Sequence, residues 1–207
     1  MKKIILIVLT VILLGGIGFR IWDVNQAVEL PLVHTYEIGE EVAIEDNIFL
    51  DDYENMEGYT VTVNHAEILS YDEFMTKYNY DGPDLHFDEN DWFYPEMVYD
   101  LNITIKNTNQ TEDPDENKYI SFLHYELIGT DIRLTASEEL YPIANPELDH
   151  HVVEGFTLRP DSEMSFNIPY NFSPSNNISP IKTEAIIKDQ IHLMVSLYPE
   201  VNRILIE

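Results

Sequence analysis

The chain has 207 residues, and its 38 aspartates and glutamates against 11 lysines and arginines give a formal net charge of −27. This charge excludes a nucleic-acid-binding protein, because phosphate contacts need clustered cations. Hydrophobic residues make up 44% of the chain, which is enough to bury a core, and the lack of cysteine excludes disulfides and thiolate catalysis.

The first predicted element is a membrane anchor at residues 1–22. Lys2 and Lys3 precede sixteen residues without a charge, which end at Phe19. At 1.5 Å per residue this run spans about 24 Å, and Trp22 extends it into the membrane interface. Because a small-x-small cleavage motif is missing, we expect an uncleaved, single-pass transmembrane helix in the cell membrane. A protein secreted after cleavage is the alternative.

The part that follows is predicted to lie outside the cell, because both lysines precede the apolar run. It divides into a stalk at 23–35 and one domain at 36–207. Residues 23–207 carry eight lysines and arginines against 38 aspartates and glutamates, so their net charge is −30. Anionic lipids and wall polymers repel such a domain unless a cation bridges them.

A short helix interrupts the strands of this domain. The apolar positions of 59–68 change parity near Asn64 and His65, which predicts a β-bulge. Ser70 and Glu73 then have the spacing of a capping box. Apolar residues at positions i, i+3, i+4 and i+7 form one stripe, so we expect a helix over 71–78 that packs on the sheet.

An acidic and aromatic insertion follows at 79–96. Its residues Tyr80, Phe87 and Trp92 are candidates for binding a partner, because aromatic rings beside carboxylates suit sugar rings and basic protein surfaces. The alternative is that Trp92 to Tyr94 begin the next strand and fold inward into the core.

The rest of the chain is mostly strand-like. Alternating apolar residues predict half-buried strands at 97–106, 163–170 and 191–197. The stretch 119–128 is apolar on both faces, as in a central strand, and the turn at 159–162 suits antiparallel neighbours. We therefore predict a mainly-β fold, an immunoglobulin-like antiparallel β-sandwich.

One acidic stretch has the spacing of calcium ligands. Asp113, Asp115 and Asn117 match the first three ligand positions of an EF-hand loop. The match then fails, because Lys118 stands where the loop requires a glycine. We expect a solvated acidic loop and assign no metal site, and a calcium-dependent binding module is the alternative.

The sequence shows no catalytic motif. Its seven histidines lack zinc-ligand spacing, and P-loop, G-x-G-x-x-G and G-x-S-x-G motifs are missing. A pair of carboxylates is uninformative in so acidic a chain. We therefore assign no catalytic residue and no cofactor, and expect a non-enzymatic binding or accessory module. A surface hydrolase is the alternative.

Several segments, in their order along the chain, resemble a known family. They are Phe19-Arg20-Ile21-Trp22-Asp23-Val24-Asn25, Tyr36-Glu37-Ile38-Gly39-Glu40-Glu41-Val42, Ala66-Glu67-Ile68, the strand 101–107, Leu158-Arg159-Pro160-Asp161-Ser162 and Ser196-Leu197-Tyr198-Pro199. The chain resembles the uncharacterised, membrane-anchored proteins of Gram-positive bacteria that carry an extracellular immunoglobulin-like domain of unknown function. This resemblance implies a surface location and contact with a protein or a cell-wall component, and it transfers no catalytic residues.

Overall fold

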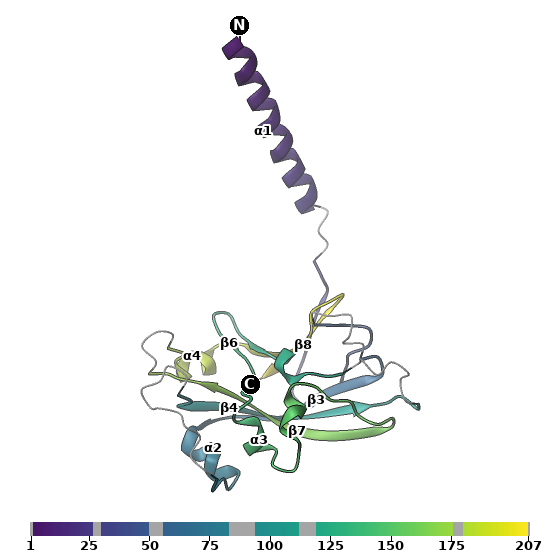
Figure 1. The fold of residues 1–207 in the computed structure, drawn as a ribbon, viewed down its shortest axis with the longest axis vertical. Helices are drawn as coiled ribbons and strands as arrows, with labels where there is room; N and C mark the ends of the chain where they lie inside the picture. The colour runs from purple at the N-terminus through teal and green to yellow at the C-terminus, as the bar shows by residue number, and fades with distance from the viewer. Residues whose placement is uncertain are drawn as a thin grey trace. The chain divides into compact units, whose positions relative to one another are not determined.

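The computed structural model describes residues 2–26, 30–49, 56–82, 94–111, 119–175 and 180–206. The chain forms two compact units, Met1–Pro31 and Leu32–Glu207. The first unit contains the helix α1 (Lys2–Gln26), and the second is mainly β (Figure 1).

The second unit contains short helices among its strands. The strands are β1 (Val33–Tyr36), β2 (Val42–Ala43), β3 (Tyr59–Ser70), β4 (Met97–Asn107), β5 (Leu127–Ile128), β6 (Arg133–Leu134), β7 (Ser162–Phe172), β8 (Ile191–Ser196) and β9 (Val201–Ile206). The helices are α2 (Tyr71–Lys77), α3 (Tyr141–Ala144), α4 (Thr183–Lys188) and the 3-10 turns η1 (Phe122–His124) and η2 (His150–Val153).

The strands form two sheets, which confirms the mainly-β prediction. One sheet is antiparallel and has the order β2-β3-β4-β7. The other has the order β1-β9-β8-β5-β6 and is mixed, because β1 runs parallel to β9. The consecutive strands β2, β3 and β4 share one sheet, whereas an immunoglobulin domain changes sheets after two strands.

The main core lies between the two sheets. Fully buried side chains from the first sheet, such as Val61, Ile103 and Phe166, share it with Leu127 and Leu193 of the second. A second apolar cluster joins α2 and α3 to the outer face of the first sheet. Figure 1 shows both helices on the side of β4 and β7 that faces away from β6 and β8. The first sheet is therefore covered on both faces near these helices.

Local signals predict α2 and the bulge correctly. Ser70 Oγ accepts a hydrogen bond from the Glu73 N–H at 3.3 Å, and Glu73 Oε2 accepts one from the Ser70 N–H at 2.8 Å. The register of β3 against β4 shifts between Val63 and His65. The strand predictions at 97–106, 163–170 and 191–197 correspond to β4, β7 and β8. The half-buried pattern predicted for 191–197 is wrong, because every residue of β8 is buried.

The central strand predicted at 119–128 is wrong. In the structure Ile120 makes an isolated bridge to Phe156, and η1 and the two-residue β5 follow. Phe122 packs its ring against Phe156 and Phe166, with ring centres 5.0 and 4.9 Å apart. The residues are apolar on both faces because this compact turn is buried, and not because a strand runs there. Beyond the turn at 159–162, β7 pairs with β4.

The N-terminal segment is a helix, as predicted. Among the residues that the structure describes, none forms a helix long and apolar enough to cross a membrane. The transmembrane prediction for residues 1–22 is therefore not supported. The sheet also begins inside the predicted stalk, since Val33 already pairs with Val201.

Candidate functional site

A groove of about 510 Å³ opens beside β3, where the two sheets approach α4. We call it the seam groove. Its volume falls within the range of small-molecule binding pockets. It is lined by Ala66, Glu67 and Ile68 of β3, Tyr99 of β4, Ile186, Ile187, Lys188, Asp189 and Gln190 at the end of α4, and Leu205 and Ile206 of β9.

Two unpaired strand edges border the seam groove. β2 pairs with β3 only at Thr60 and Val61, so the rest of β3 has no strand on that side among the described residues. Likewise, β1 pairs with β9 only as far as Ile204, which leaves Leu205 and Ile206 beyond it. The groove therefore lies where both sheets end without a described outer neighbour.

The floor of the seam groove is apolar. Ile186 and Ile206 are buried, and Ile68 packs against the main core. Tyr99 is only 5% exposed, and burial raises the pKa of its hydroxyl to about 12. At the rim, Ile187 is 69% exposed and lines the same groove, so the apolar surface of the floor extends to the outside there. Covering such an apolar surface with a partner lowers the free energy of the complex.

The rim also carries charges of both signs, Lys188 and Asp189. Asp189 accepts hydrogen bonds from the Thr130 N–H at 2.7 Å and the Thr130 hydroxyl at 2.8 Å. The hydroxyl bond is the main reason that the pKa of Asp189 is lowered. These bonds tie the end of α4 to the connection between β5 and β6, so the wall of the groove is fixed.

A charged cluster lies on the outer face of the sheet, next to the seam groove. Lys77 Nζ is 2.6 Å from Asp100 Oδ2 and 2.8 Å from Glu67 Oε1. The Tyr78 hydroxyl donates a hydrogen bond to Asp100 Oδ2 at 2.7 Å. Glu67 and Asp100 are direct partners in the β3–β4 register. We call Glu67, Lys77, Tyr78 and Asp100 the Lys77 cluster.

The attraction between the charges of this cluster is strengthened because Asp100 is buried. The Asp100 side chain is 1% exposed, and its Oδ1 atom is buried without a hydrogen-bond partner among the described residues. Burial lowers the pKa of Lys77, but hydrogen bonds to Asp100 and Glu67 outweigh this effect and raise it above its ordinary value. Burial, together with Asp100, raises the pKa of Tyr78. The cluster holds α2 on the sheet.

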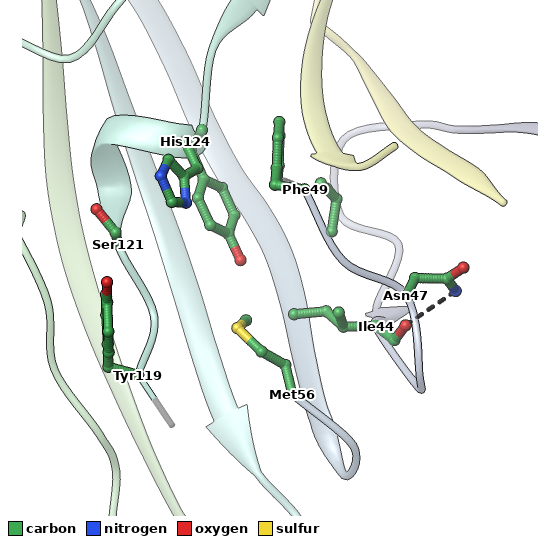
Figure 2. A pocket seen from close by; sticks show the side chains of 9 residues that line it. Ile44, Asn47, Phe49, Met56, Tyr119, Ser121 and His124 are labelled. Carbon is green, nitrogen blue, oxygen red and sulfur yellow. Dashed lines mark hydrogen bonds between the residues drawn. The ribbon is translucent and has the colours of Figure 1, made fainter. Parts of the chain in front are cut away.

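A second, smaller pocket lies at another place in the same unit (Figure 2). Figure 2 shows Tyr119, Ser121 and His124 on one side and Ile44 and its neighbours on the other, with the hydrogen bond between the Asn47 amide and the Ile44 carbonyl dashed. Its volume of about 10 Å³ has room for a single water molecule. We therefore do not regard it as a ligand site.

The sequence-predicted partner residues have different outcomes. Tyr80 is half-buried and packs against the second apolar cluster. Phe87 and Trp92 lie outside the described residues.

The proposed calcium ligands also lie outside the described residues. These are Asp113, Asp115 and Asn117, within the undescribed segment 112–118. In the part of the chain that the structure describes, no group of three or more histidines, aspartates or glutamates is placed to hold a metal ion.

Sequence reasoning missed both the seam groove and the Lys77 cluster. The alternation at 97–106 placed Asp100 on the polar, solvent-facing side of its strand. That placement is wrong, because α2 covers the sheet there and Asp100 is buried. A usable signal was Tyr78, which ends the apolar stripe of the helix directly after Lys77. The groove had no local signal, since unpaired edges depend on which strands pair.

The Lys77 cluster generates a stability prediction. Lys77→Met leaves the Asp100 carboxylate buried without its cation, so we expect the free energy of unfolding to fall by about 3 kcal/mol. The double variant Lys77→Met with Asp100→Leu removes both charges and recovers most of this loss. Urea denaturation followed by circular dichroism measures both.

Lys106→Met is the matched control. The Lys106 side chain is 42% exposed and its Nζ lies 3.8 Å from Oε1 of the exposed Glu41, so its loss costs less than about 1 kcal/mol. Equal destabilisation by Lys77→Met and Lys106→Met would contradict the role given to the buried pair.

Comparison with known proteins gives one match. Residues 33–202 fit the family model described as a domain of unknown function, DUF5028. No curated protein and no solved structure matches the chain. The matched region runs from β1 into β9 and includes the Lys77 cluster and all of the seam groove except Leu205 and Ile206. Because it covers more than half of the sequence, the chain belongs to the DUF5028 family.

Proposed function

We propose that this chain is a non-enzymatic binding module, held at the outer face of a cell membrane, that contacts another protein through the seam groove. The observation that carries the proposal is the groove itself, with its apolar floor, fixed walls and large exposed side chain at Ile187. Cores of protein interfaces combine such apolar floors with a polar rim. The proposal needs no cofactor.

The charged groups beside the groove favour binding over hydrolysis. A glycoside hydrolase needs two carboxylates that face the substrate and act as acid and as base or nucleophile. Here Glu67, the carboxylate of β3 on the groove wall, makes an ion pair with Lys77, and Asp189 is held by Thr130. Both carboxylates are thus used to hold the fold together.

The proposed membrane location rests on α1. The side chains of Leu9, Val11, Ile12, Leu13 and Leu14 are all about 60% exposed, although they point to different sides of the helix. Apolar surface of this extent is unfavourable in water and needs a cover. A lipid bilayer supplies it, and Lys2 and Lys3 favour an extracellular second unit. The proposal includes the Gram-positive origin implied by the family resemblance.

A phage-displayed random peptide library tests binding at the groove. Selection on the full chain in detergent micelles should enrich peptides whose affinity falls about tenfold in Ile187→Asp, because the new charge lies on the apolar rim. The matched control Tyr198→Asp, at a residue of similar exposure outside the groove, should change affinity less than about twofold. No enrichment, or equal effects of both variants, would overturn the proposed binding role.

Vesicle flotation tests the membrane location. The full chain, diluted from detergent into neutral phosphatidylcholine vesicles, should float with the lipid because α1 buries its apolar side chains there. A variant that lacks residues 2–22 should remain in the dense fraction. Flotation of the truncated variant, or failure of the full chain to float, would exclude α1 as the anchor.

A further inference from the structure

We propose that the partner of the seam groove is an extended, basic segment of another polypeptide, which adds as a strand to the open edge of β3. This inference rests on the proposed binding function and names the partner's chemistry. Strand addition gives affinity through main-chain hydrogen bonds and specificity through alternate side chains, so it suits a site that combines a strand edge with a pocket.

The direction of the β3 backbone follows from two hydrogen bonds. The Gly39 N–H donates to the Val63 carbonyl at 2.9 Å, so Val63 turns its backbone groups away from β4. At the other edge of the sheet, the Asn167 N–H of β7 donates to Asn145 Oδ1 at 2.9 Å, so the backbone groups of Asn167 also face away from β4. Val63 is paired with Ile103 of β4, and Asn167 is paired with Asn102 of β4. The backbone groups of Ile103 therefore face β7 and those of Asn102 face β3, and because this direction alternates along a strand, it is known for every residue of β4.

The same alternation identifies the open groups of β3. Leu101 and Tyr99 of β4 lie two and four positions from Ile103, so their backbone N–H and C=O groups also face β7 and not β3. Their partners on β3 are Ala66 and Ile68, beyond the bulge. The N–H and C=O groups of Ala66 and Ile68 therefore face the open edge, and both residues line the seam groove.

The described residues leave this part of the edge uncovered. β2 reaches no further than Val61, and the Ser70 N–H is already bonded to Glu73. Among the residues that the structure describes, no backbone hydrogen bond outside the regular strands involves Ala66 or Ile68. An uncovered edge beside an apolar floor is a template for a further strand.

The net charge of the second unit indicates which residues the partner segment contains. Residues 32–207 carry eight lysines and arginines against 36 aspartates and glutamates, so this unit has a net charge of −28. Such a field attracts cationic chains and repels acidic ones. In a strand, alternate side chains point to opposite sides, so apolar residues can enter the groove while basic residues point outward. An alternating basic and apolar segment meets both demands.

The test uses a fluorescent peptide of alternating lysine and valine, with a glutamate and valine peptide as its charge control. Fluorescence anisotropy with the full chain in detergent micelles should show binding of the lysine peptide only. Ala66→Pro removes an outward N–H that the β3–β4 ladder does not use, so binding should weaken about tenfold. Ser165→Pro is the matched control, because Ser165 has the same parity as Asn167 on β7, so its N–H also faces away from β4, and it does not line the groove.

Hydrogen exchange provides a second measurement that does not depend on how well the proline variants fold. Bound lysine peptide should slow the exchange of the Ala66 and Ile68 amides and leave that of Ser165 unchanged. If the lysine peptide does not bind, or if neither Ala66→Pro nor hydrogen exchange registers its binding, strand addition is wrong. If Ile187→Asp alone weakens the library peptides, groove binding stands and only the strand-addition inference fails.

Discussion

The second unit of this chain depends on the long antiparallel pairing of β3, β4 and β7. β3 has twelve residues and pairs with β4 along its whole length, whereas its outer neighbour β2 covers only two of them. This mismatch leaves an edge whose backbone groups need water or another chain as hydrogen-bond partners. The bulge between Val63 and His65 lies where the covered part of β3 ends, and it sets which residues face the opening.

The same strand pair also carries the ion pairs of the Lys77 cluster. Glu67 and Asp100 lie opposite each other on the outer face, and Lys77 of α2 contacts both carboxylates. Without this cation, two acidic side chains would repel each other across one register position. The pairing docks α2 on the sheet, and it also occupies the Glu67 carboxylate next to the seam groove. What remains of the groove is mainly apolar surface and unpaired backbone.

Features that depend on short stretches of sequence could be predicted, and those that depend on strand pairing could not. The capping box of Ser70 and Glu73 and the parity change near Asn64 involve neighbouring residues, so α2 and the bulge were found. Asp100 was misplaced because its burial depends on α2 packing over the sheet. The turn around Phe122 looked like a strand, because periodicity does not distinguish a buried strand from another buried segment. Predicting the seam groove would require knowing where the pairing of β2 with β3 and of β1 with β9 ends.

The most direct test of this account is hydrogen exchange of the individual β3 amides in the full chain without any partner. The alternation predicts that Ala66 and Ile68 exchange quickly, because their N–H groups face the open edge, whereas Glu67 and Leu69 exchange slowly, because theirs pair with β4. Equal protection of all four amides would contradict the open edge, and with it the binding surface on which the proposed function rests.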